Sequence, residues 1–140
     1  MPISPVLRRG KAADLETIVQ FNLAMAKETE DIILDSVTVR RGATAVLSDP
    51  RRGFYLLAEV NGRLAGQLMV TPEWSDWRGQ WFWWIQSVYV APEFRRRGLF
   101  AALFGEVHKQ ADRLRREADR VAEHARLVAD LQAAGQRKAC

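Results

Sequence analysis

The chain reads Gln86-Ser87-Val88-Tyr89-Val90-Ala91-Pro92-Glu93-Phe94-Arg95-Arg96-Arg97-Gly98 where a strand gives way to a basic turn. Residues 81–90 are dense in aromatic and β-branched side chains, which favour a strand. Pro92 ends this strand because proline has no N–H to donate to a sheet. A helix follows, with apolar side chains that recur on one side: Phe100, Leu103, Phe104 and Val107. The stretch therefore predicts the order strand, glycine-containing turn, helix.

This turn gathers backbone amide donors. The first N–H groups of a helix have no acceptor within the helix, so those of residues 96–100 would point toward one spot. Gly98 permits a ligand to approach the backbone closely, and Arg95, Arg96 and Arg97 supply positive charge. Such a spot suits a diphosphate. The alternative interpretation is a solvated basic turn that merely leads into a helix.

A β-hairpin is predicted upstream of this turn. Residues 54–60 and 63–70 carry apolar side chains at short spacing on either side of Asn61-Gly62. Asn-Gly is the strongest two-residue hairpin signal, because a type I′ turn needs positive φ at both central positions. Residues 71–80 are expected to form a turn-rich excursion before the strand at 81–90.

The first fifty residues are expected to form a short strand and two helices. The strand is placed at residues 3–8, and an amphipathic helix runs from Asp14 to about Lys27, with acidic residues at its start. An acidic, irregular stretch at 28–35 would connect it to a second helix at 38–47, which Ser48-Asp49-Pro50 ends.

A heptad pattern continues beyond the turn. Its apolar residues are spaced 4-3-4-3-4-3, namely Val107, Ala111, Leu114, Ala118, Val121, Ala125 and Val128. We therefore expect one helix from Leu99 to Ala134, capped at Gly135 and roughly 54 Å long. That length exceeds the diameter of so small a domain, so self-association through this helix, as a dimer, is a further expectation. We divide the chain into an incomplete domain at 1–110 and a helical extension at 111–140.

Composition limits the class of protein. The chain has 140 residues, 48% hydrophobic and 27% charged, which suits one globular domain. It shows no membrane-length apolar run and no signal-peptide start, and Cys140 is its single cysteine. We therefore expect a cytoplasmic protein without disulfides, metal or membrane contact. The net charge of +4 favours phosphate-bearing ligands in general, whereas grounds for nucleic-acid binding are weak.

The strand, turn and helix resemble the fingerprint of the GNAT superfamily of acyl-CoA-dependent N-acetyltransferases. That fingerprint reads Arg/Gln-x-x-Gly-x-Gly/Ala. Arg95-Arg96-Arg97-Gly98-Leu99 matches it, and Phe100 departs at the last position. Val88-x-Val90-x-Pro92, the Asn61-Gly62 hairpin and the early strand–helix–helix order also fall where the family has them. The resemblance covers roughly residues 3–110. It implies an α+β fold of the three-layer acyl-CoA N-acyltransferase type, with a mostly antiparallel sheet flanked by helices.

The resemblance also implies a cofactor and a reaction. Acetyl-CoA would be bound by Val88, Tyr89, Val90, Arg95, Arg96, Arg97, Gly98, Leu99 and Phe100. In this scheme the amides of residues 96–100 hold the diphosphate, and the pantetheine arm pairs with the backbone at Val88 and Val90. An amine of a small molecule or peptide would attack the thioester directly, with the Val88 N–H as oxyanion donor.

Two catalytic groups of the family have no clear counterpart. Many members carry Glu where this chain has Gln86, and an amide cannot accept a proton at neutral pH. Water or another carboxylate would then serve as the base, and the candidates are Glu28, Glu30, Asp31, Glu73 and Asp76. The family's usual proton donor is a tyrosine on a late helix, whereas this chain has Tyr55 and Tyr89 and no predicted strand beyond residue 110.

These departures keep a second hypothesis open. The C-terminal part would be truncated, frameshifted or divergent relative to the family. The chain would then be a catalytically impaired CoA-binding or self-associating module that uses its C-terminal helix.

The tryptophans form the remaining unusual feature, because all five lie between residues 74 and 84. We assign Trp81, Trp83 and Trp84 to strand packing or an interface, and Trp74 and Trp77 to contacts with the acceptor.

Overall fold

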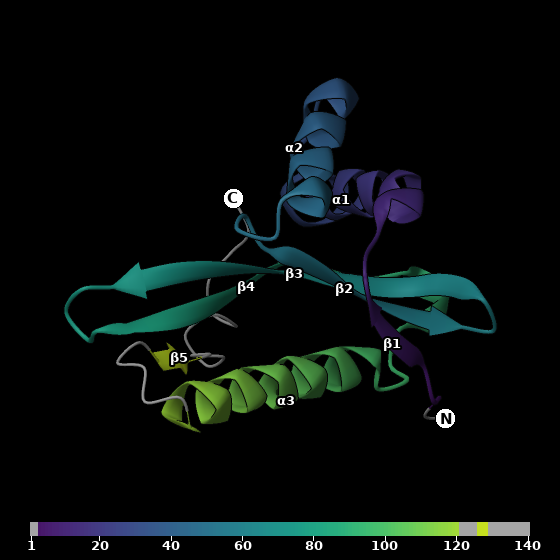
Figure 1. Cartoon of the computed structure of the whole chain (residues 1–140). Helices are drawn as coiled ribbons and strands as arrows, with labels where there is room; N and C mark the ends of the chain where they lie inside the picture. The colour runs from purple at the N-terminus through teal and green to yellow at the C-terminus, as the bar shows by residue number, and fades with distance from the viewer. Residues whose placement is uncertain (1–2, 121–125, 129–140) are drawn as a thin grey trace.

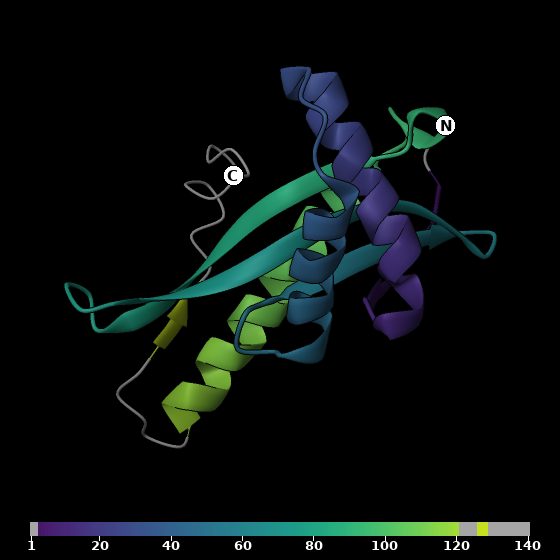
Figure 2. The same ribbon diagram turned by 90° about the horizontal axis from the view of Figure 1, so that it is seen from above.

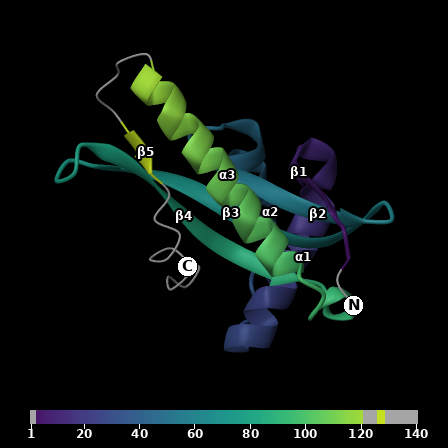
Figure 3. The same cartoon turned by 90° about the horizontal axis from the view of Figure 1, so that it is seen from below.

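The protein is built in three layers. The computed structural model describes residues 3–120 and 126–128, with the side chains of residues 3–116. Helices α1 (Leu15–Glu30) and α2 (Ser36–Ser48) cover one face of a sheet, and α3 (Leu99–Arg120) covers the other (Figure 1). Seen from below, α3 lies obliquely across the strands (Figure 3). The predicted three-layer α+β fold with a long helix after the turn is confirmed.

The sheet has the strand order β1-β2-β3-β4-β5. Strands β1 (Val6–Arg9), β2 (Phe54–Val60), β3 (Arg63–Ser75) and β4 (Gln80–Val90) pair antiparallel with their neighbours. Strand β5 (Arg126–Val128) is parallel to β4. The expected mostly antiparallel sheet is thus confirmed, with one parallel pair at its edge.

The hairpin at Asn61-Gly62 forms as predicted, and both residues have positive φ, 52° and 77°. The expected excursion at 71–80 is wrong. Strand β3 runs on to Ser75, which pairs with Gln80, so only residues 76–79 turn. Here cross-strand aromatic packing outweighs the turn-forming residues: the Trp74 and Trp81 rings lie 5.4 Å apart, edge to face. The resulting β3–β4 ribbon projects beyond the helices (Figure 2).

The first two helices form close to their predicted positions. Helix α1 extends to Glu30, three residues further than expected, and Asp31 then takes a left-handed conformation with φ 53°. Helix α2 begins at Ser36 because the Asp35 side chain accepts a hydrogen bond from the Thr38 N–H at 3.1 Å.

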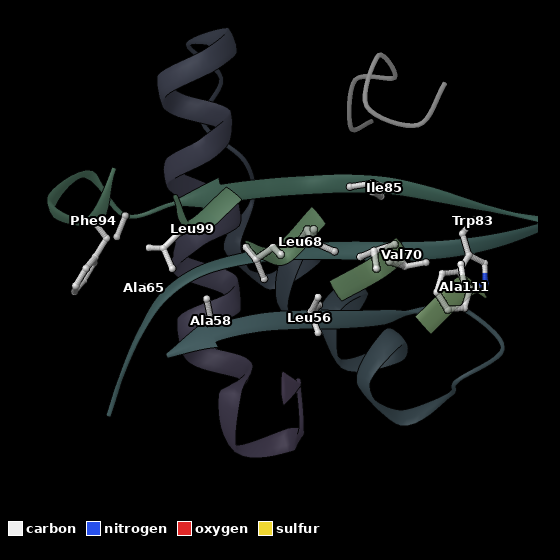
Figure 4. Close-up of a cluster of buried hydrophobic side chains, with 13 residues drawn as sticks. Leu56, Ala58, Ala65, Leu68, Val70, Trp83, Ile85, Phe94, Leu99 and Ala111 are labelled. Carbon is white, nitrogen blue, oxygen red and sulfur yellow. The ribbon is translucent and has the colours of Figure 1, made fainter. Parts of the chain in front are cut away.

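The larger core lies between the sheet and α3. Strands β2, β3 and β4 contribute Leu56, Leu68, Val70 and Ile85, which are shown with their neighbours in Figure 4. From α3 the same core receives Leu99, Leu103, Val107 and Ala111, all at most 4% exposed. The start of the predicted heptad seam is therefore buried within the chain rather than offered to a partner. A smaller core on the other face joins α1 and α2 to Tyr55 and Leu57.

The uninterrupted helix to Ala134 is wrong, and so is the expectation of no strand beyond residue 110. Residues 126–128 form β5, in which Arg126, Leu127 and Val128 pair with residues 80–82. The outer edge of β4 carries backbone N–H and C=O groups that need partners, and residues 126–128 pair with them as a strand, which a continued helix could not do. Val121 and Ala125 of the predicted heptad pattern, and the predicted helix cap at Gly135, lie outside the described residues. The division at residue 110, which α3 crosses unbroken, and the dimer both stay predictions.

Candidate active site

A bulge interrupts β4 next to the fingerprint. Gln67 pairs with Tyr89 and Met69 with Gln86, so two residues of β4, Ser87 and Val88, face a single residue of β3. Ser87 has a positive φ of 55°, which a non-glycine residue rarely adopts. The bulge takes the peptide that precedes Val88 out of the regular β3–β4 ladder.

The outer edge of β4 is open at this bulge as far as the described residues go. Within the residues that the structure describes, β5 pairs only with residues 80–82. From Ile85 to Val90 the outer side of the strand therefore has no paired strand in the described part of the chain. An extended ligand can add there as a further strand.

The turn after β4 lies where the sequence predicts the cradle for a diphosphate. Arg96 and Gly98 have positive φ, 62° and 83°, and α3 begins at Leu99. The Ala102 N–H bonds to the Gly98 carbonyl at 3.0 Å, which makes Ala102 the first residue of the helix with a backbone acceptor in the described chain. A hollow of about 270 Å³ opens here, lined by Val90, Phe94, Arg95, Arg96, Gly98, Leu99, Phe100 and Ala101.

Phe100 and Arg97 lie differently within this turn. Phe100 stands where the fingerprint has Gly or Ala; it is 45% exposed, and its ring packs on Phe104 at 5.6 Å. It thus forms part of the wall and leaves the hollow open. Arg97 does not line the hollow, and its carbonyl accepts a hydrogen bond from the Ile3 N–H at 3.4 Å.

Arg95 links the end of β4 to the end of α1. Its Nε donates to the Val90 carbonyl at 2.8 Å, and its Nη2 donates to Glu28 at 3.0 Å. The guanidinium also lies 5.4 Å from the Tyr89 ring centre. Burial raises the pKa of the Tyr89 hydroxyl, and the nearby negative charge of Glu28 raises it further. The same hydroxyl also hydrogen-bonds with Glu28. Arg95, which the sequence predicts to contact the diphosphate, therefore holds the Glu28 carboxylate beside β4.

Gln86 is not placed to act as a base. Its Nε2 donates to the Thr71 hydroxyl at 2.8 Å, so the side chain is used as a donor. The proposed carboxylates are separated by the fold, and it is Glu28 that the structure joins to the end of β4. Asp31 pairs with Lys27, Glu30 is exposed on the α1 end, and Glu73 and Asp76 lie on the β3–β4 ribbon, where Glu73 accepts a hydrogen bond from Trp84.

A buried chain of polar side chains lies behind the bulge and was not predicted from the sequence. Gln67 is 0% exposed, and its Nε2 donates both to the Ser87 carbonyl and to Asn22 Oδ1, each at 3.0 Å. Asn22 also hydrogen-bonds Tyr55, whose pKa burial raises. The available signal was a polar residue at a core-facing position of an apolar strand, and another on the buried face of α1.

The tryptophans divide between core and surface. Trp83 is 5% exposed and packs in the core, as predicted, whereas Trp74 and Trp77 are 46% and 94% exposed on the ribbon. A strand rises about 3.3 Å per residue, so the ribbon end at Gln80 is about 26 Å from Val88. The structure does not bring Trp74 and Trp77 to the bulge and cradle.

Among the side chains described, no group of three or more His, Cys, Asp or Glu is arranged to hold a metal ion. None of the described helices is both long enough and apolar enough to span a membrane.

Comparisons with known proteins agree with this geometry. Residues 17–133 match the profile of a protein family described as "Acetyltransferase (GNAT) family". A possible acetyltransferase from Clostridium difficile 630 shares 38% identity and a TM-score of 0.76 over 89% of this chain and 76% of that chain. No curated protein matches.

More distant solved structures share the fold. An integron cassette protein from the mobile metagenome of Cole Harbour Salt Marsh is 22% identical, with a TM-score of 0.70 over 94% of this chain and 82% of that one. A predicted acetyltransferase with acetyl-CoA from Clostridium acetobutylicum is 17% identical, with a TM-score of 0.59 over 89% of this chain and 80% of that one. The bulge, the cradle and a family match over most of the sequence lead to one conclusion: this chain belongs to the GNAT family of acetyltransferases.

Proposed function

We propose that the protein transfers an acetyl group from acetyl-CoA to a primary amine by direct attack of the amine on the thioester. Family membership supports acyl transfer in general. One observation carries the more specific proposal: the bulge at Ser87-Val88 and the hollow before Leu99 lie at the same end of β4. A long ligand with a diphosphate at one end and a reactive thioester at the other fits this arrangement.

Binding would use backbone groups for the most part. The N–H groups at the start of α3, with Gly98 and Arg96, would hold the diphosphate. The pantetheine arm would lie along the open edge of β4 from Val90 to Val88, which are about 7 Å apart. Arg95 covers the Val90 carbonyl in the free protein, so an arm that pairs there displaces one hydrogen bond of this side chain.

The reaction needs a donor for the oxyanion and a base for the amine. As the amine nitrogen bonds to the carbonyl carbon, negative charge builds on the oxygen, and the Val88 N–H is the donor we assign to it. The C–S bond then breaks, and the CoA thiolate takes up a proton from water. The amine attacks in its neutral form, and as the base that first takes the proton from its ammonium form we propose Glu28, which is 40% exposed in its ion pair with Arg95 and is joined to the end of β4.

Calorimetry and thiol release test the proposal in two steps. Titration with CoA and acetyl-CoA should show binding that weakens in Arg95→Ala and remains in Arg113→Ala. The control removes an exposed arginine from α3, about 21 Å along the helix from Leu99. Release of free thiol with a panel of primary amines then measures turnover. A wild-type chain that binds neither ligand would overturn the proposal, and binding without turnover would favour a catalytically impaired CoA-binding module.

A further inference from the structure

Gln67 is a polar side chain at a fully buried position of the sheet. It lies on β3 between Leu57 of β2 and Tyr89 of β4, and it is fully buried. Within the described part of the chain its Oε1 is buried without a hydrogen-bond partner. Leaving such an atom unsatisfied costs about 1–3 kcal/mol. The two N–H groups of the amide are therefore what this side chain contributes.

The orientation of this amide follows from its partners. The Ser87 carbonyl can only accept a hydrogen bond, so Gln67 must turn its Nε2 toward it. The second N–H of the same nitrogen then requires an acceptor, which is Asn22 Oδ1. Asn22 is 9% exposed on α1, so helix and strand together fix the Gln67 side chain.

The bond to Ser87 sets the direction of the next amide. In a trans peptide the C=O and the N–H point in opposite directions. The Ser87 carbonyl turns inward to a residue of β3, so the N–H of Val88, which belongs to the same peptide, turns away from β3 toward the outer edge of β4. Ser87 holds this arrangement at a φ of 55°, a conformation that costs roughly 1–2 kcal/mol without support.

We propose that Gln67, anchored by Asn22, is a positioning residue that aims the Val88 N–H at the oxyanion of the transition state. This inference rests on the proposed acetyl transfer. Gln67 lies on the inner strand behind the bulge and acts only through the Ser87 peptide.

Replacement by an apolar side chain of similar length tests the role. Gln67→Met removes both donors, and Leu57→Met is the matched control because Leu57 is its buried cross-strand neighbour. Loss of an oxyanion donor lowers kcat by about 10²–10³, so misdirection of this one should lower kcat by about 10- to 100-fold. The dissociation constant for CoA should stay within about two-fold, because the cradle before Leu99 is untouched. Equal kcat values in the two variants would overturn the inference.

A second variant separates hydrogen bonding from packing. In Gln67→Glu, only the protonated carboxyl can donate to the Ser87 carbonyl. The ratio of its kcat to that of the wild type should therefore rise as the pH is lowered from 8.5 to 6. A ratio that does not change with pH would contradict the role.

A measurement on the wild-type protein needs neither turnover nor a stable variant. The Val88 amide should exchange with solvent deuterium far faster than the amide of Leu56 in the sheet centre, because it points to the open edge. Equal protection of the two amides would overturn the inference even for an active enzyme. Wild-type protein with a fast Val88 amide and no thiol release would instead refute only the proposed function.

Discussion

Substitution of Gly98 probes the diphosphate cradle. Gly98 has a φ of 83°, and a Cβ built on it meets no atom within 4 Å. Gly98→Ala therefore introduces backbone strain of roughly 1–2 kcal/mol without a steric clash in the free protein. Gly98→Glu adds a carboxylate at the same strain. At about 8 Å from a phosphate charge, with an effective dielectric constant near ~20, the repulsion is about 2 kcal/mol per pair of charges.

These values predict graded losses of affinity. The Glu variant should bind CoA about 30-fold more weakly than the Ala variant, since about 1.4 kcal/mol corresponds to ten-fold. Calorimetry with CoA measures the difference. Turnover of S-acetylpantetheine, which has the thioester but no diphosphate, provides the control and should be equal in the two variants. If the Glu variant binds CoA as tightly as the Ala variant, the start of α3 at Leu99 does not hold the diphosphate.

Three further outcomes are expected. Glu28→Gln should lower kcat/KM by about 10- to 100-fold at neutral pH with little change in CoA affinity, measured by thiol release and calorimetry, and an unchanged rate would exclude Glu28 as the base. The bidentate hydrogen bond from the Arg8 guanidinium holds the pKa of the buried Asp14 carboxyl below its usual value. The stability from this pair is therefore present above the unfolded pKa of about 4 and is lost as the pH falls through the lower folded value. Asp14→Asn should unfold more easily in urea at pH 7, and the difference should shrink below about pH 4; a difference independent of pH would contradict this. Gly62→Val should lower the free energy of unfolding by about 1–2 kcal/mol, because valine at a φ of 77° is strained, and an unchanged urea midpoint would argue against the type I′ turn.

Local patterns in the sequence predicted much of the site. The turn at Arg95–Gly98 is encoded by Pro92, Gly98 and the apolar spacing of α3, all within about fifteen residues. A hollow therefore opens beside this turn, where the diphosphate cradle is predicted. Phe100 could not be judged from the fingerprint alone, because its effect depends on whether the ring enters the hollow or packs on Phe104.

Features that depend on contacts between distant residues were missed. The bulge at Ser87 has no turn residue to mark it, and its support comes from Asn22 and Gln67, 65 and 20 positions earlier in the chain. Glu28 was one of five equivalent carboxylates until its ion pair with Arg95, formed across 67 positions, joined it to β4.

The amino-acid sequence by itself determined the hairpin at Asn61-Gly62, helices α1 and α2 to within a few residues, and the strand–turn–helix unit. Each of these is decided by backbone preferences and side-chain periodicity over a few neighbouring residues. Tertiary structure decided how residues 126–128 pair, how far the β3–β4 ribbon extends and in which direction the Val88 amide points. These outcomes depend on which unpaired backbone group or buried donor lies across the sheet, and only the folded chain brings those partners within hydrogen-bonding distance.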